Sequence, residues 1–210
     1  MALTLYVGSK RYSSWSLRPY LALAHTNLAF ETKTILLDQQ DTKSKIAAVS
    51  PAARVPVLHH DELVVWDSIA ICEYIAELAP DAKLWPTDRA QRAKARAISA
   101  EMHSGFVPLR RDMPMDVLSK KPGVGHTADA LADAKRVMAI WREALSVSGG
   151  PFLFGHFTIA DAMFAPVTTR FTTYGVELDD VCTKYVTHVH ALSGFKQWLA
   201  DAEAEPQTRA

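Results

Sequence analysis

Serines and an aspartate stand where two helices are expected to begin, and such positions favour negatively charged ligands. In the first of these places, Ser13, Ser14 and Ser16 precede an apolar run at residues 20–25, with Pro19 between them. Proline is tolerated in the first turn of a helix but not in its interior, so this helix begins near Ser14 to Ser16. The helix dipole then favours an anion beside the serines. Alternatively, the hydroxyls only cap the helix.

The second place follows a predicted hairpin within residues 50–75. Apolar runs at residues 55–58 and 63–66 predict two short strands joined by a polar turn. Asp67 and Ser68 then open a helix whose apolar residues recur at helical spacing. Unpaired backbone N–H groups and a hydroxyl at such a helix start form a ready site for a carboxylate.

Pro56 stands at the start of the first hairpin strand, where proline is tolerated, and the Val55–Pro56 bond is a candidate for the cis form. A cis bond would turn the backbone amide and carbonyl of Val55 out of the sheet, toward an extended peptide. Taken singly, Pro56 is a turn proline and Ser68 a helix cap. Together, on either side of one hairpin, they suit a small peptide that carries a free carboxylate.

The elements around these residues follow the order strand, helix, strand, then strand, strand, helix, which predicts a thioredoxin-like sheet. The first two strands are expected at residues 3–7 and 30–37, and a polar loop at 38–45. A thioredoxin would carry a CxxC motif after its first strand. Residues 13–16 are Ser-Ser-Trp-Ser instead, which excludes chemistry by a protein dithiol.

The rest of the chain predicts an all-helical domain, so the fold class is α/β followed by all-α. We expect a thioredoxin-like domain at residues 1–79, a proline-containing linker at 80–88 and a helical domain at 89–210. Thr158 and Asp161 have the spacing of a capping box that opens a buried helix. The other helices are expected at residues 89–118 (bent near Pro108 or ended near Pro114), 128–147 and 186–202.

Composition excludes several classes of function. A net charge of zero without a basic patch argues against nucleic acid as a partner, and no apolar stretch is long enough for a membrane span. Cys72 and Cys182 lie far apart, which indicates neither a disulfide framework nor a zinc site and suits the cytoplasm. The polar run at residues 59–62 is interpreted as a solvated hairpin tip, so no metal is expected.

As an ordered set, these motifs resemble the cytosolic glutathione transferases, and among their classes the zeta, or maleylacetoacetate isomerase-like, type. DSIAICEYI is similar to the family's glutathione-binding helix, and TIADAMFAPV to its folding motif in the helical domain. The zeta Ser-Ser-Cys-Ser run is matched by Ser13 to Ser16, with Trp15 in place of Cys. The stretch at residues 96–111 is also zeta-like, with Arg110 where that class has a Gln. The resemblance implies that glutathione is the co-substrate and that the protein is a homodimer.

The resemblance also implies roles for individual residues. Ser13 is the first choice for the hydroxyl that stabilises the glutathione thiolate, and Ser14 the second. The expected glutathione contacts are Trp15, Arg54, Val55, Pro56, Asp67 and Ser68. The electrophile is expected between the domains, against Met102, His103, Phe106 and Arg110. A stripe of methionine and aromatic residues can equally be plain core, whereas an arginine there suits an anionic substrate.

Three functions follow. The first is conjugation of glutathione to small hydrophobic or anionic electrophiles, and the second is glutathione-dependent cis–trans isomerisation of a maleyl-type diacid. Zeta isomerases hold the diacid with an arginine, but Thr173 occupies the aligned place here and Arg170 comes about one turn earlier. The third is a non-catalytic protein with the same fold that binds ligands or a partner chain.

Overall fold

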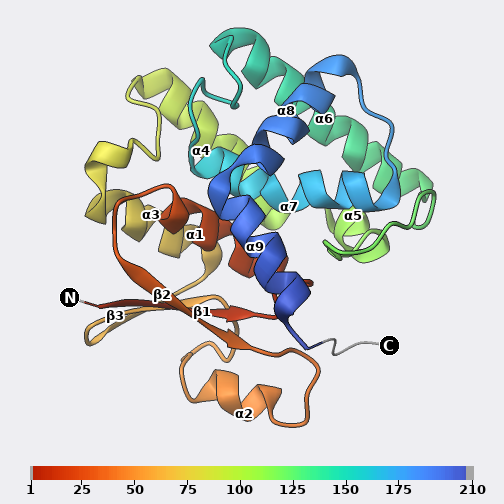
Figure 1. Ribbon diagram of the computed structural model, residues 1–210. Helices are drawn as coiled ribbons and strands as arrows, with labels where there is room; N and C mark the ends of the chain where they lie inside the picture. Colours follow the sequence, from red (N-terminus) through yellow and green to blue (C-terminus); the bar gives the residue numbers. More distant parts are fainter. Residues whose placement is uncertain (1, 207–210) are drawn as a thin grey trace.

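The computed structural model describes residues 2–206, which form a four-stranded sheet followed by a layer of helices (Figure 1). The strands are rich in β-branched and apolar residues, and the side chains of the first strand that are fully buried alternate with half-buried ones. In chain order the strands are β1 (Leu3–Gly8), β2 (Phe30–Ile35), β3 (Val57–His60) and β4 (Leu63–Trp66).

The sheet has the order β2-β1-β3-β4, with β1 parallel to β2 and the other two pairs antiparallel. Helices α1 (Ser14–Ala24) and α3 (Ser68–Leu78) cover one face, and the short helix α2 (Thr42–Ala47) lies on the opposite side (Figure 1). This arrangement is the predicted thioredoxin-like sheet. It brings the starts of α1 and α3 to neighbouring places, because both helices lie on the same face and pack against each other.

Helix α2 falls within and just beyond the segment expected to be a loop. Only two of its side chains, those of Thr42 and Ile46, are buried, and they are one turn apart. A single helical turn carries too little periodicity to be recognised in a sequence. A 3₁₀ turn at Pro80–Ala82 follows α3, and the expected domain division at residues 80–88 stays a prediction.

The helical half differs from expectation at two places. The helix expected from residue 89 is interrupted close to the bend expected near Pro108, but as a full break: it ends at Ser104, and Phe106 has a left-handed backbone (φ 58°) before a new helix begins. The final segment is two helices that meet at Leu192 rather than one. The helices of this half are α4 (Arg89–Ser104), α5 (Val107–Asp112), α6 (Ala128–Ser148), α7 (Ile159–Tyr174), α8 (Asp180–Ala191) and α9 (Ser193–Ala204).

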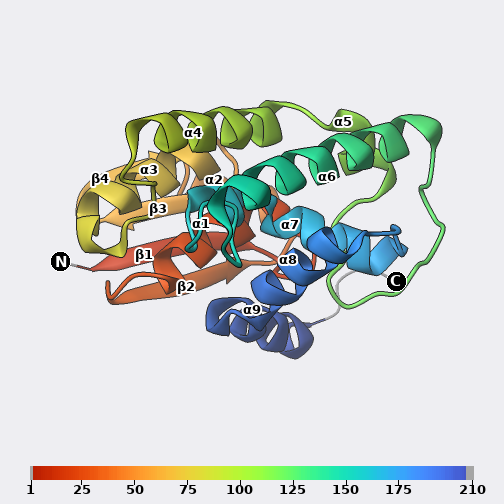
Figure 2. The ribbon, with the colours of Figure 1, turned by 90° about the horizontal axis from the view of Figure 1, so that it is seen from above.

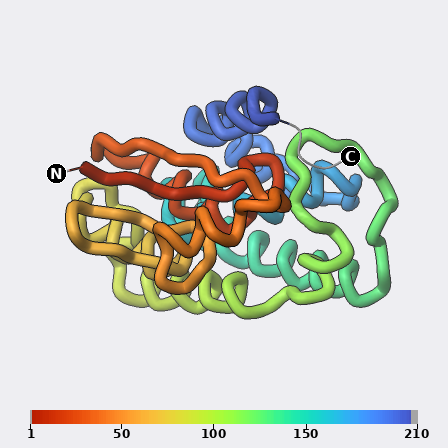
Figure 3. Tube along the Cα trace, turned by 90° about the horizontal axis from the view of Figure 1, so that it is seen from below, coloured from red at the N-terminus to blue at the C-terminus, as the bar shows by residue number. Residues whose placement is uncertain are grey.

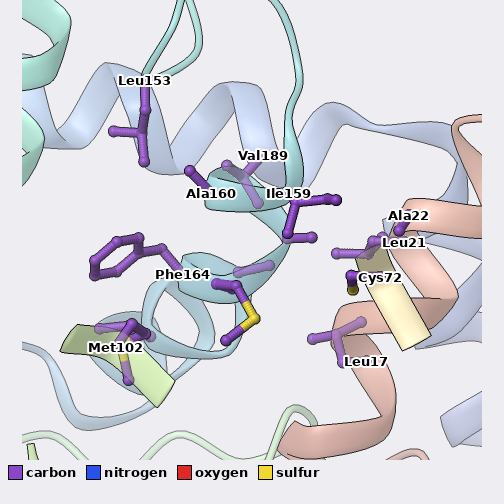
Figure 4. Packing of buried hydrophobic residues seen from close by; sticks show 14 of the residues in the cluster. Leu17, Leu21, Ala22, Cys72, Met102, Leu153, Ile159, Ala160, Phe164 and Val189 are labelled. Carbon is purple, nitrogen blue, oxygen red and sulfur yellow. The ribbon is translucent and has the colours of Figure 1, made fainter. Parts of the chain in front are cut away.

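One hydrophobic core joins the two halves. Helix α7 runs through the middle of the helical layer, and all of its residues except Thr172 are buried (Figure 2). It packs against both α1 and α4: Leu21 of α1 lies beside Ile159 of α7, whereas Phe164 points away from α1 (Figure 4). Seen from below, the sheet lies beside the helical layer along one side of the molecule (Figure 3). The start of α1 is thereby held against the helical half.

The side-chain carboxylate of Asp161, at the start of α7, accepts four hydrogen bonds. Its Oδ2 accepts from the backbone N and the Oγ1 of Thr158, at 2.8 and 3.0 Å, as the capping-box spacing predicted. Its Oδ1 accepts from Leu153 N at 3.0 Å and from the Tyr185 hydroxyl at 3.2 Å. Burial raises the pKa of the Asp161 carboxyl to about 6, although the four hydrogen bonds oppose that shift.

None of the helices formed by residues 2–206 combines the length and the apolar character needed to span a lipid bilayer.

Candidate active site

A cavity of about 410 Å³ opens where the hairpin, the start of α3 and the start of α1 meet α4. All six residues expected to contact glutathione line it, and His103 of α4 is the only expected electrophile contact that does. Two lining residues were not predicted: Trp66, which directly precedes Asp67 and could have been found from its place, and Ala52, which carries no chemical signal. The lining residues are Trp15, Ala52, Arg54, Val55, Pro56, Trp66, Asp67, Ser68 and His103.

Asp67 and Ser68, at the start of α3, have different roles. The Val55–Pro56 bond beside it is cis, as predicted. Asp67 is the cap, because its Oδ1 accepts from the backbone N–H groups of Ile69 and Ala70 at 2.9 and 3.4 Å. Ser68 does not need to cap the helix: its side chain is 1% exposed and its hydroxyl has no partner among residues 2–206. A buried hydroxyl without a partner, at a helix start that lines a cavity, can donate a hydrogen bond to a ligand in that cavity.

The serines at the start of α1 also differ from one another. Ser13 Oγ donates to Ser16 Oγ at 2.7 Å, and Ser16 Oγ accepts in turn from Gly8 N at 3.1 Å. Ser14 Oγ accepts from Arg170 Nη2 at 3.4 Å. Ser13 occupies the cap position of α1, but its side chain makes no capping hydrogen bond. Both serines are buried and neither is among the residues that line the cavity, and the Ser14 hydroxyl keeps its own proton free to donate.

Trp15 lines the cavity and also contacts two arginines and a histidine. Its side chain is 37% exposed, and its ring meets the ring of His103 edge-on with the centroids 5.3 Å apart. The Cζ atoms of Arg18 and Arg110 lie 4.3 and 4.8 Å from the centroid of the same indole. His103 Nε2 is 3.2 Å from Asp67 Oδ2. Burial, with the two arginines, lowers the pKa of His103, so this imidazole is neutral at pH 7.

The other three residues expected at the electrophile site do not line the cavity. Met102 and Phe106 belong to the hydrophobic core. Arg110 is half-buried and donates to the carbonyls of Met102, His103 and Gly105 at the end of α4. A cation is favoured at the carboxyl end of a helix, so Arg110 completes α4 while it lies against Trp15.

Two protein-family models match the chain. The N-terminal domain of glutathione S-transferases matches residues 12–78, and the C-terminal domain matches residues 88–203. The chain belongs to the glutathione transferase family. It is therefore an enzyme of that class, with the zeta-like character that the motifs indicated.

Curated relatives of this transferase include maleylacetoacetate isomerases. A probable maleylacetoacetate isomerase of Caenorhabditis elegans is 43% identical over 117 residues, which are 56% of this chain and 54%, or about half, of the relative. The maleylacetoacetate isomerase of Rattus norvegicus is 24% identical over 188 residues, 89% of this chain and 85% of the relative. A crystal structure of a Burkholderia glutathione transferase homologue with bound glutathione is 26% identical, with a TM-score of 0.76 and coverage of 98% of this chain and 100% of that one.

Two buried arginines of the transferase were not predicted as site residues. Arg18 of α1 is wholly buried, and none of its three side-chain nitrogens has a hydrogen-bond partner among the described residues. Arg170 of α7 reaches Ser14 from the helical half. Each stands within an apolar helix, where an arginine without an evident partner is unusual, and this was the available signal. The described residues contain no group of ligands that could hold a metal ion.

Proposed function

We propose that this transferase binds glutathione in the 410 Å³ cavity and transfers its thiolate to small electrophiles. The observation that carries the proposal is the gathering of all six expected glutathione contacts around one cavity. The Burkholderia homologue, which covers nearly the whole chain, holds glutathione in its crystal structure. The cavity lining and the bound glutathione of the homologue are independent support, because the first concerns residues of this chain and the second a related protein with its ligand.

The tripeptide would lie along the hairpin with its γ-glutamyl end at α3. Ser68 Oγ and the backbone N–H groups beside it would donate to the γ-glutamyl carboxylate. The backbone of Val55 would pair with the cysteinyl residue. Arg54, which is exposed at the rim, would reach the glycyl carboxylate. This pose points the sulfur toward the start of α1, and the electrophile would approach past Trp15 and His103.

The chemistry needs an ionised sulfur. A free thiol titrates near pH 8.5, so little glutathione is thiolate at neutral pH. Ser14 is the better donor of the two candidates, because its hydroxyl proton is free while that of Ser13 is donated to Ser16. The start of α1 adds the positive end of a helix dipole. The thiol proton passes to solvent, and the sulfur lone pair then attacks the electrophile.

Substitution of Ser68 is expected to weaken glutathione binding. Ser68→Ala removes one hydrogen bond to a carboxylate, which corresponds to a rise in Kd of about 10-fold or more. Calorimetric titration with glutathione measures it. Ser99→Ala is the matched control, because Ser99 is also buried with an unpartnered hydroxyl but lies outside the cavity. Equal Kd values for the two variants would place the γ-glutamyl end elsewhere.

Isomerisation of a maleyl-type diacid is the second candidate, since two of the relatives are named maleylacetoacetate isomerases. One assay series separates the alternatives: glutathione calorimetry, then thiol consumption with a panel of electrophiles, then conversion of maleylacetone. Net loss of thiol supports conjugation. Conversion of maleylacetone without thiol loss supports isomerisation, and binding without either reaction supports a non-catalytic protein.

We further propose a homodimer in which α3 and α4 form the contact, as the family resemblance implies. Leu63 and Trp66 of the edge strand β4 are large apolar side chains that are 47% and 48% exposed beside these helices. Sedimentation equilibrium is expected to give twice the 23.2 kDa chain mass. A monomer at all concentrations would contradict this proposal without affecting the assignment of the cavity.

A further inference from the structure

Arg170 carries a buried charge that is not neutralised by any carboxylate contact among residues 2–206. Its side chain is 4% exposed. Nε donates to the carbonyl of Met113 at 2.9 Å, Nη1 to that of Pro166 at 3.5 Å, and Nη2 to Ser14 Oγ at 3.4 Å. All three acceptors are uncharged. A buried guanidinium with such partners favours an anion nearby, because burying a charge without a counter-ion is costly.

Two further arginines increase the positive charge at this place. Arg18 and Arg110 lie against Trp15, and we call these two with Arg170 the arginine cluster. Arg18 is wholly buried, and its guanidinium nitrogens have no hydrogen-bond partner among the described residues. Arg110 donates hydrogen bonds only to backbone carbonyl oxygens. Burial, with the charge of Arg110, lowers the pKa of Arg170 to about 9, so Arg170 remains protonated at pH 7. Burial, with the charges of Arg110 and Arg170, also lowers the pKa of Arg18. Positive charge therefore gathers at the first turns of α1, from Arg18 within the helix and from Arg110 and Arg170 beside it.

The hydrogen bond between Arg170 and Ser14 fixes the direction of the hydroxyl. A guanidinium can only donate, so Ser14 Oγ must accept from it. The Ser14 proton then points to another acceptor, and no hydrogen bond from this hydroxyl is present among the described residues. The proton of the Ser13 hydroxyl is instead donated to Ser16 Oγ, so it is not free for a ligand.

We propose that Arg170 is a positioning residue for the glutathione thiolate: it holds Ser14 Oγ as an acceptor, so that the Ser14 proton is directed at the sulfur. The charge of the arginine cluster then favours the ionised sulfur, which becomes the counter-ion that Arg170 lacks. This inference rests on the proposed function and adds to it a residue from the helical half.

Three ionisable groups near the cluster have pKa values shifted away from the range near neutral pH in which the bound thiol is expected to titrate. Burial raises the pKa values of Cys72 and Tyr174 above their usual values, and lowers that of His103. Two carboxylates oppose the charge of the cluster: Asp67, which contacts His103, acts on Arg18, and Asp133 acts on Arg110. A titration of bound thiol over this range therefore reports the sulfur.

The test is a pH titration of enzyme-bound glutathione, followed by the ultraviolet absorbance of the thiolate. In Arg170→Met the midpoint is expected to rise by about one pH unit, which is a tenfold loss of thiolate below both midpoints. Arg170→Lys keeps the positive charge but loses the planar set of guanidinium donors, and we expect a smaller rise in the midpoint. Arg111→Met is the control, because Arg111 is exposed and paired with Asp112, and its midpoint should equal that of the unsubstituted enzyme.

A merely structural role for Arg170 would give a different pattern. If Arg170 acts through Ser14, adding Arg170→Met to Ser14→Ala produces a smaller shift than it does alone. An unchanged midpoint in Arg170→Met, with glutathione still bound, overturns the inference and leaves the proposed function intact. If Arg170→Met does not fold, Arg170→Lys decides: a raised midpoint supports the inference and an unchanged one overturns it. Failure of the unsubstituted enzyme to bind glutathione would instead remove the proposed function.

Discussion

Ser14→Ala is expected to lower kcat/KM for conjugation about 100-fold while glutathione still binds. The hydroxyl would donate to the sulfur, and a hydrogen bond to a charged group contributes about 1.5–3 kcal/mol. Lowering a thiol pKa by two units requires about 2.7 kcal/mol, so one such bond, aided by the helix dipole and the arginine cluster, is of the right size. The side chain is buried and is not among the residues that line the cavity, so we expect its removal to leave the contacts of the tripeptide backbone in place.

Ser13→Ala is the matched control for this experiment. The two serines are adjacent and equally buried, but the Ser13 hydroxyl donates to Ser16 rather than being free. We expect its effect on kcat/KM to be several-fold at most, and the pH profile to keep its midpoint. A larger loss in Ser13→Ala than in Ser14→Ala would return the role to Ser13, the first choice from the motif. No loss in either variant would exclude a serine mechanism.

Asp161→Ala is expected to have the largest effect on stability, lowering the free energy of unfolding by about 3–5 kcal/mol. Four buried donors would lose their acceptor, and each unsatisfied buried donor costs about 1–3 kcal/mol before the structure relaxes. Urea unfolding followed by circular dichroism measures the change. Asp88→Ala is the control: Asp88 caps α4 through one exposed hydrogen bond to Gln91 N, so its loss should cost about 1 kcal/mol. Equal effects would show that the buried network adds nothing to an ordinary cap.

The effect of Asp161→Ala on the free energy of unfolding is expected to depend on pH. Burial raises the pKa of the Asp161 carboxyl in the folded protein to about 6, above its ordinary value of 3.8. A group whose pKa is raised by folding binds its proton more tightly in the folded state. Its contribution is therefore complete below pH 3.8 and is lost as the pH rises through about 6. The difference in stability between the unsubstituted enzyme and Asp161→Ala should be larger at pH 5 than at pH 7.5, and a difference that grows with pH would contradict the raised pKa.

Local features of the sequence carried much of the fold. The hairpin and the start of α3 were predicted because proline, the polar turn and the capping aspartate act within a few residues of one another. Six expected contacts therefore line the cavity: five of them come from residues 54–68, which form one continuous surface. Element ends were less predictable. The break at Phe106 has a local signal, because Gly105 ends α4 and Pro108 lies in the first turn of α5, but the division at Leu192 has no proline or glycine at the turning residue.

What the sequence by itself determined is the set of elements, their order and the residues that share a short segment. Only the tertiary structure decided which serine has a free proton and what faces it, because Ser14 and Arg170 are 156 residues apart in the chain. The contact exists because α1 packs against α7 in the common core. Helix α7 also packs against α4, and Trp15 of α1 meets His103 of α4 and Arg110 of α5. Burial of apolar surface drives such packing without direction, so the pairing of distant polar groups depends on the geometry of the whole core and not on local preference.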